Sequence, residues 1–404
     1  MTDVLPQASR SRIVTVGGGK GGVGKSIVAL NLAAALAQQG KRVVIADMDL
    51  GAANQHLLLG LSNPGPGLQA LLDKSVEEAK DCLTETPVPN LRLLAGTSAV
   101  FGAANITHAE KVRLLQKLRA LEADIVVVDV GAGVGYNMLD FFGLGSRKLL
   151  VTTPQVTAIH DAYSFLKGAV LRILHHNAEK AIEAALLEPA EASSRGEKVV
   201  EILARLRDLR PELADKVFAE LARFGACLVG NQVVNTAQAG VFRAVAQTMR
   251  GYLGLEVPVL GCLRSSPMIH DSVNRRRPLA LDPDCEDAAA FRELARALMA
   301  TLPAAEDDFE IVEDEGVLAE SSATQSPRPA AFAADPPAPV AARPEAAAPS
   351  PAPVAAIAPP PLHVAAKPAA RAARGRPPRV PKEHRSSKEQ PRLPGLTPRP
   401  VRPH

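Results

Sequence analysis

Short runs of β-branched and aliphatic residues alternate, over the first 300 residues, with longer segments in which apolar residues recur at helical spacing. Within 124–130 (DIVVVDV), four consecutive apolar residues are followed by Asp129, which is typical of a strand buried on both faces. Neighbouring parallel strands are usually joined by crossover helices, so this alternation predicts an α/β fold with a doubly wound, mostly parallel sheet. The predicted strands are 12–16, 42–46, 91–94, 124–130, 148–152, 226–234 and 257–262, and the clearest predicted helices are 26–39 and 286–301.

One long stretch interrupts the alternation. About 70 residues between the strands near 153 and 226 have no strand pattern, which is too long for one crossover helix. Helical spacing covers 158–187 and 197–224, with a polar break between them. We predict a helical insertion at about 175–222, which either packs on the sheet edge or forms a surface for a partner.

Charge and proline divide the chain into a body and a tail. Net charge is +3 over 404 residues, yet residues 361–404 alone carry +9 and the rest −6. Of the 34 prolines, 22 lie at or after residue 301. We predict a flexible N-terminus at 1–11, a folded domain at 12–302 and a disordered tail at 303–404 that is acidic, then Ala/Pro-rich, then basic.

Several classes of protein are disfavoured. The four cysteines form no C-x-x-C pair, which argues against disulfide scaffolds, zinc ribbons and cysteine-bridged iron–sulfur sites. No apolar run reaches the ~18 residues of a membrane helix, and residues 1–12 show no secretory apolar region. We therefore predict a cytoplasmic protein without a transmembrane segment.

A glycine-rich octet follows the first predicted strand and opens the first predicted helix. Residues 19–26 read GKGGVGKS, which fits G-x-x-x-x-G-K-[ST] in the strand–loop–helix context that this phosphate-binding motif requires. Glycines let backbone N–H groups turn toward phosphate oxygens, and the helix N-terminus adds positive potential. Lys25 is expected to reach the β- and γ-phosphates and the Ser26 hydroxyl to bind Mg²⁺. The predicted contacts to ATP in the loop are Gly19, Gly21, Gly22, Val23, Gly24, Lys25 and Ser26.

Three carboxylates follow predicted strands. Asp129 ends an apolar strand, as does the aspartate that holds Mg²⁺ in nucleotide sites of this kind. Asp47 and Asp49 form D-x-D after the second strand, where extended backbone would point both side chains the same way. We predict that one of them faces the metal or the loop lysine and the other the attacking water. The predicted metal ligands are Ser26, Asp47 and Asp129.

A lysine directly after the first loop glycine, Lys20, gives the deviant form of the phosphate loop. With the segments at 43–61 (VVIADMDLGAANQHLLLGL) and 127–133 (VVDVGAG), it makes the sequence resemble the MinD/ParA family of dimeric ATPases. Within that family the likeness is to the flagellar-number regulators (FlhG, also called FleN) and to MinD. It covers roughly 12–301, apart from about 175–222.

The resemblance implies an ATP-dependent homodimer with two nucleotides between its subunits. It implies that Lys20 crosses the interface to the partner's nucleotide, and that Asp49 orients the attacking water. Lys20, Lys25 and Asp49 are thus the expected catalytic residues. On the adenine side, the resemblance points to Asn231 and Pro267.

Both ends of the chain depart from the relatives. Residues 1–12 do not match the N-terminal activating helix of the flagellar regulators, and the proline-broken C-terminus lacks the amphipathic membrane-targeting helix of MinD. Arg374, Gly375, Arg376 and Pro377 form the core of an AT-hook, which lies along the A·T minor groove of DNA. DNA contact, protein binding or simple solubilisation, and attraction to acidic lipid all stay open for this tail.

The sequence thus predicts an ATP-hydrolysing, Mg²⁺-dependent dimerisation switch that positions or counts a flagellum or pole, a division site or a chromosome. An unidentified protein partner or activator is expected, as is association with the nucleoid or a pole. The alternative is an ATP-dependent scaffold for DNA or a regulator, in which hydrolysis is incidental.

Overall fold

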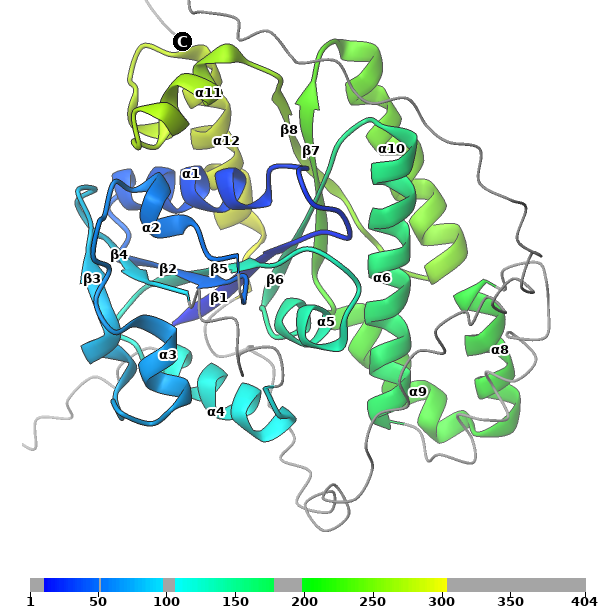
Figure 1. The fold of residues 1–404 in the computed structure, drawn as a ribbon. Coiled ribbons are helices and arrows are strands. Elements are labelled where there is room, and N and C mark those ends of the chain that lie inside the picture. Colours follow the sequence, from blue (N-terminus) through cyan, green and yellow to red (C-terminus); the bar gives the residue numbers. More distant parts are fainter. Residues whose placement is uncertain (1–10, 51, 97–105, 178–197, 304–404) are drawn as a thin grey trace, which may run out of the picture. The chain divides into compact units, whose positions relative to one another are not determined.

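One eight-stranded sheet forms the centre of the protein. The computed structural model describes residues 11–50, 52–96, 106–177 and 198–303. The strand order is β3-β4-β2-β5-β1-β6-β7-β8, and every neighbouring pair is parallel except β3 with β4 (Figure 1). The strands are β1 (Arg12–Gly17), β2 (Val43–Met48), β3 (Leu83–Glu85), β4 (Leu91–Leu94), β5 (Ile125–Val130), β6 (Arg147–Thr152), β7 (Ala226–Val233) and β8 (Val259–Arg264). The predicted α/β class with a mostly parallel sheet is confirmed.

Helices cover both faces of this sheet (Figure 1). On one face lie α1 (Lys25–Gln38), α11 (Pro267–Asn274) and α12 (Glu286–Thr301). On the other lie α3 (Gly67–Leu72), α4 (His108–Arg119), α5 (Tyr136–Gly143), α6 (Val156–Asn177), α8 (Val199–Leu209), α9 (Pro211–Arg223) and α10 (Thr236–Leu253). The short α2 (Gln55–Leu58) and the 3-10 turns η1 (Ala79–Cys82) and η3 (Leu279–Leu281) complete the described elements.

Alternation along the central strand explains why both faces are covered. In β1, Val14 and Val16 pack into the core beneath α1 and α12, whereas Ile13 packs into the core on the α4 side. All six residues of β5 are buried, as its continuous apolar run predicts. The helix α1 is itself buried along most of its length, so the chain after β1 lies deep in the fold.

The helical insertion is present within the described residues as α8 and α9, which follow the long α6. Their apolar residues, including Leu206 and Val217, pack with Val170 of α6 and Phe242 of α10 in one core beside β6 and β7. Pro211 occupies the first turn of α9, which separates it from α8. This packing favours the first of the two interpretations of the insertion, extra cover on the sheet edge.

Two strand expectations need correction. The last strand runs from Val259 to Arg264, two residues later than predicted, and the buried Val257 precedes it. The three-residue β3 was not predicted, since so short a segment shows no alternation, and it is the antiparallel member of the sheet. The predicted N-terminus and tail lie outside the described residues, apart from residues 11 and 303 at their edges.

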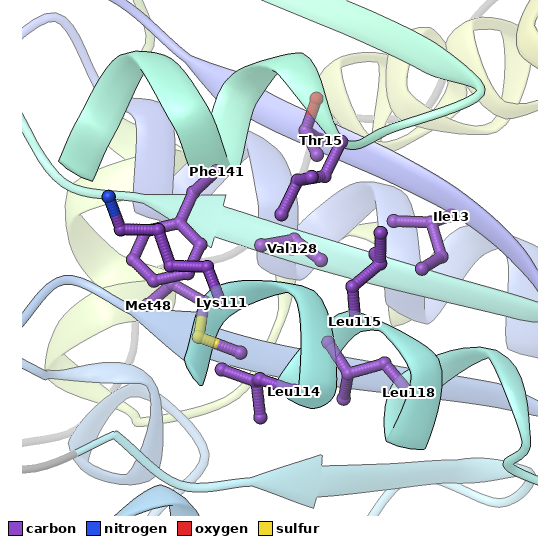
Figure 2. A pocket seen from close by; sticks show the side chains of 10 residues that line it. Ile13, Thr15, Met48, Lys111, Leu114, Leu115, Leu118, Val128 and Phe141 are labelled. Atoms are coloured by element: carbon purple, nitrogen blue, oxygen red, sulfur yellow. The ribbon is translucent and has the colours of Figure 1, made fainter. Parts of the chain in front are cut away.

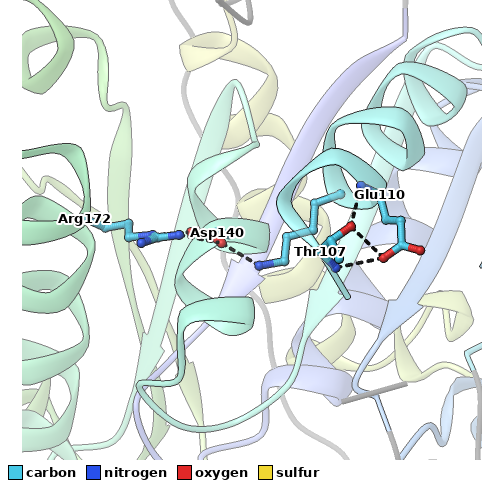
Figure 3. A network of polar contacts seen from close by, with 5 residues as sticks. Thr107, Glu110, Asp140 and Arg172 are labelled. Carbon is cyan, nitrogen blue, oxygen red and sulfur yellow. Dashed lines mark hydrogen bonds and ion pairs between the residues drawn. The ribbon is translucent and has the colours of Figure 1, made fainter. Parts of the chain in front are cut away.

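Beneath α4 the interior holds a small cavity and a charged cluster. The cavity, ≈ 10 Å³ and lined mainly by apolar side chains such as Leu114 and Phe141, is at the lower limit for a single water molecule (Figure 2). Lys111 lines it and donates from Nζ to Asp140 of α5 at 2.6 Å. Arg172 of α6 donates to the same carboxylate, and a Thr107–Glu110 capping box starts α4 alongside (Figure 3). This cluster ties three helices together.

Candidate functional site

The residues predicted to act on a nucleotide meet at the carboxyl ends of the parallel strands. The glycine-rich loop leaves β1, and Asp47 at the end of β2 stands in register with Asp129 at the end of β5. β1 lies directly beside β5, with Val16 opposite Asp129. Ligands of open α/β sheets bind outside this edge, so the topology alone brings the loop and the carboxylates together.

The loop requires glycine at two positions for different reasons. Gly24, which precedes α1, has φ 91°, and a Cβ there would lie 2.3 Å from the side-chain nitrogen of Asn231. A Cβ on Gly19 would lie 2.1 Å from the carbonyl oxygen of Asp161. No side chain caps the first N–H groups of α1, and no acidic residue occupies its first turn. These donors are therefore placed to receive an anion.

Lys25 is the buried cation of the site. Its side chain is only 7% exposed, and Nζ donates to the carbonyl oxygen of Lys20 at 3.3 Å. Burial lowers the pKa of Lys25, while the charges of Asp129 and Asp49 raise it. A phosphate would supply the strong negative partner that the loop carbonyl does not.

Asp129 carries an incomplete set of hydrogen bonds. Its Oδ2 accepts from Gln55 Nε2 at 2.7 Å, whereas its buried Oδ1 has no partner. Burial and the charge of Asp47 raise its pKa to about 7, although the hydrogen bond from Gln55, the neighbouring Ser26 and the charge of Lys25 act to lower it. A divalent cation would supply the missing partner for this carboxylate. Asp129 and Ser26 therefore fit Mg²⁺, which takes one or two protein oxygens together with phosphate oxygens.

Asp47 and Asp49 make different contacts, although only Met48, the last residue of β2, separates them. Asp47 is buried and accepts backbone N–H bonds from Asp49, Asn54 and Gln55 at 3.2, 2.9 and 3.0 Å. The pKa of Asp47 is raised, because the effect of burial exceeds that of these hydrogen bonds, which act to lower it. In this conformation Asp47 organises the segment after β2. Asp49 is half-buried, acts on Lys25 through its charge, and has Oδ1 2.8 Å from where a Cβ on Gly131 would stand.

Lys20 lies half-buried at the edge of the site. Its Nζ donates at 2.8 Å to Thr157 Oγ1, in the first turn of α6 of the same chain. A lysine in this position is accessible to a second molecule once that single bond is released. Its role across a dimer interface stays a prediction.

The two residues expected near adenine lie on β7 and at the start of α11, and one backbone hydrogen bond joins the chain beside them. Asn231 is buried and donates from Nδ2 to the carbonyl oxygen of Val23 at 2.8 Å. Pro267 begins α11, and the backbone N–H of Ser265 just before it donates to Val233 O. Contact with adenine itself stays a prediction for both.

Three polar contacts to the site were missed at the sequence level. Gln55 bonds Asp129 and Ser26, Thr157 holds Lys20, and Gln232 donates to the carbonyl oxygen of Gly22 at 3.2 Å. Gln232 adopts φ 56°, an uncommon value for a residue other than glycine. Gln55 lies within the segment 43–61 quoted for the resemblance, but no spacing rule marks any of the three residues.

Comparison with known proteins agrees with this geometry. Residues 9–170 match the ParA family model, described as NUBPL iron-transfer P-loop NTPase. The antiactivator FleN of Pseudomonas aeruginosa is 35% identical over 158 residues, which are 39% of this chain and 55% of FleN. The chain is thus similar to P-loop NTPases of the ParA/MinD family.

Two further relatives extend the match. The septum site-determining protein MinD of Helicobacter pylori is 25% identical over 71% of this chain and 90% of that protein. MinD of Pyrococcus horikoshii, solved with Mg-ADP, shares the fold with a TM-score of 0.50 and 20% identity over 71% of this chain and 96% of its own. By contrast, the alignment with FleN spans only about half of that protein's length.

Some expectations for this chain fall elsewhere. The four AT-hook residues at 374–377 lie outside the described residues. Among the described residues, no three His, Cys, Asp or Glu side chains gather as a metal site, and no helix is long and apolar enough to cross a membrane.

Proposed function

We propose that the chain binds ATP with Mg²⁺, hydrolyses it, and pairs with a second copy of itself only in the ATP state. The observation that carries this is the phosphate loop, which places Lys20 at the edge of the site and Lys25 in its interior. Asp129 belongs to the same site, and its buried Oδ1 has no hydrogen-bond partner. Such a protein is a timed switch, because its dimer surface forms in one nucleotide state and is lost after hydrolysis.

The chain's own groups divide the work of hydrolysis. Backbone N–H groups of the loop and the ammonium of Lys25 hold the β- and γ-phosphates. Ser26 and Asp129 hold Mg²⁺, which neutralises negative charge on the phosphates. Asp49 orients a water molecule for attack on the γ-phosphorus, so that ATP and water yield ADP and phosphate. Lys20 of a second copy stabilises the charge that develops on the transferred group.

Apolar side chains at the same edge of the sheet support pairing with a second copy. Leu57, Val134, Val156 and Val234 follow β2, β5, β6 and β7, respectively, and all are exposed, Val156 to 82%. They flank the loop, because β5 and β6 border β1 in the sheet and β2 and β7 lie one strand further out on either side. Exposed apolar groups gathered around a charged centre favour a surface that becomes buried in a complex.

The relatives support a positioning role. Two of them are named as determinants of the septum site and of the flagellum site, and FleN is named an antiactivator. We infer that this chain positions or counts a cellular structure at a pole, a flagellar base, a division site or a chromosome. The DNA hypothesis rests on the basic end of the sequence alone.

The decisive experiment compares oligomeric state and turnover. We expect Asp49→Ala to abolish ATP hydrolysis and to remain a stable dimer in ATP but a monomer in ADP, measured by light scattering after gel filtration. Lys20→Ala should also abolish turnover. Asp208→Ala, on the exposed surface of α8, should match the wild type in both measurements. A monomeric Asp49→Ala protein in saturating ATP contradicts the proposal.

The same Asp49→Ala protein separates the possible targets. Co-sedimentation with A·T-rich DNA in ATP, lost when residues 361–404 are removed, would favour a chromosome-associated positioner. Capture by anionic vesicles would favour a membrane-associated one. Full biological activity of Asp49→Ala in the cell would instead favour the scaffold alternative, in which hydrolysis is incidental.

A further inference from the structure

Gln55, the first residue of α2, connects three parts of the site through one buried residue. Its backbone N–H donates to Asp47 Oδ2 at 3.0 Å. Its side-chain Nε2 donates both to Asp129 Oδ2 at 2.7 Å and to the carbonyl oxygen of Ser26 at 3.1 Å. The residue is completely buried, so water does not compete for these bonds.

These bonds make the two oxygens of Asp129 unequal. Oδ2 is occupied by Gln55, whereas Oδ1 is buried and has no hydrogen-bond partner. The side-chain oxygen of Gln55, Oε1, is also buried without a partner. A carboxylate that holds a metal is itself oriented by a hydrogen bond, and losing that bond weakens metal binding about 10- to 100-fold. Gln55 stands in that position relative to Asp129.

We propose that Gln55 is the positioning residue of the Mg²⁺ site, and that it couples this site to the segment after β2. It fixes Asp129 through Oδ2 and thereby keeps Oδ1 as the oxygen available to the cation. The inference rests on the proposed function, since it concerns Mg²⁺ bound with a nucleotide.

The coupling follows from where Gln55 stands in the chain. One amide joins the start of α2 to both Asp129 and Ser26, so a change at the metal site acts directly on α2. Leu57, two residues further along, is one of the exposed apolar side chains that flank the loop. Binding of Mg²⁺ thus affects the position of α2, and with it the exposed surface proposed to contact a second copy.

The test measures the Mg²⁺ dependence of nucleotide binding by the full chain. A fluorescent ADP analogue is titrated in EDTA and then at increasing free Mg²⁺. Gln55→Met keeps the length of the side chain but has no N–H donor. We expect it to raise the Mg²⁺ concentration for half-maximal effect at least 10-fold, with affinity in EDTA within twofold of the wild type. Gln247→Met, on the exposed face of α10, should behave as the wild type.

The second measurement is made first on the wild type and then on Gln55→Met. Hydrogen exchange of the amides at 54–58 is followed in the wild type with ADP, before and after Mg²⁺ is added. We expect these amides to change their exchange rates, and this response to be absent in Gln55→Met. An unchanged Mg²⁺ midpoint in a variant that still binds the analogue, or no response of these amides in the wild type, overturns the inference. A wild type without any Mg²⁺-dependent nucleotide binding would overturn the proposed function itself.

Discussion

Two buried aspartates on consecutive elements, Asp129 of β5 and Asp140 of α5, have opposite electrostatic surroundings. Asp140 accepts from Lys111 Nζ at 2.6 Å and Arg172 Nε at 2.8 Å (Figure 3). Burial acts to raise the pKa of Asp140, but these hydrogen bonds and charges outweigh it and hold the pKa below its usual range. At Asp129, burial and the charge of Asp47 both raise the pKa, which reaches about 7.

The difference shows what separates a structural carboxylate from a binding one in this fold. Asp140 has its cations in place and ties α4, α5 and α6 together. The cation whose charge acts on Asp129 is Lys25, which we expect to hold phosphate, and one oxygen of Asp129 is left without a partner. An unpaired buried carboxylate destabilises the ligand-free protein, and a cation would reverse that cost. The contrast can be tested by neutralising each aspartate in turn.

The largest effect is expected at Asp140. Asp140→Asn leaves Lys111 and Arg172 facing a neutral amide, and breaking a buried ion pair from one side is strongly destabilising. We expect the free energy of unfolding in urea to fall by about 3 kcal/mol. Glu256→Gln, which removes the exposed ion pair with Arg250, should unfold as the wild type does. Equal stability of Asp140→Asn and the wild type would refute the structural role of the cluster.

Neutralising Asp129 should change the free energy of unfolding in the opposite direction and stabilise the ligand-free protein. Asp129→Asn keeps the size of the side chain and removes a charge that is unfavourable in the ligand-free protein. At pH 8, in EDTA and without nucleotide, we expect the free energy of unfolding to rise on the order of 2 kcal/mol. The same variant should lose the Mg²⁺ dependence of nucleotide binding, so the gain in stability accompanies a loss of function.

The pH dependence of that gain follows from the direction of the pKa shift. The folded protein holds a proton on Asp129 up to about pH 7, whereas the unfolded chain releases it near pH 3.8. The contribution of Asp129 to stability is therefore fully present below pH 3.8 and is lost as pH rises through about 7. The gain in Asp129→Asn should shrink steadily from pH 8 toward pH 4, and a gain independent of pH would contradict the prediction. For Asp140 the direction is reversed, since its contribution is lost only as pH falls below 3.8.

Local patterns explain which parts of the structure could be predicted. The octet at 19–26, the apolar strand before Asp129 and the Ala-rich α1 are each encoded within a few consecutive residues. Parallel topology then brings their ends together. The three-residue β3 escaped prediction because it is paired only through its contact with β4.

The polar contacts could not be predicted because they join distant parts of the chain. Gln55 is 74 residues from Asp129, and Lys111 is 29 from Asp140. The turn after β2 also redirects Asp47 to backbone N–H groups, which the spacing of D-x-D does not reveal. Burial decides the behaviour of both aspartates in the comparison, and burial depends on the packed fold rather than on neighbouring residues.

The smallest effect is expected at Arg172, where a lysine would keep the charge beside Asp140 but change the geometry of the contact. Arg172 contacts both oxygens of Asp140, and its guanidinium lies 4.8 Å from the centre of the Tyr136 ring. Arg172→Lys keeps the positive charge but loses the two-pronged contact and the stacking. We expect the free energy of unfolding to fall by about 1 kcal/mol in urea.

A matched Arg264→Lys variant, whose ion pairs with Glu286 and Asp287 involve a well-exposed guanidinium, should show a smaller change. If Arg172→Lys instead costs as much as Asp140→Asn, the planar guanidinium and not the count of charges holds Asp140 ionised. The contrast with Asp129 would then rest on the shape of the cation as well as on its presence. A lysine such as Lys25 could not by itself satisfy Asp129, and that aspartate would still require a metal ion to complete its contacts.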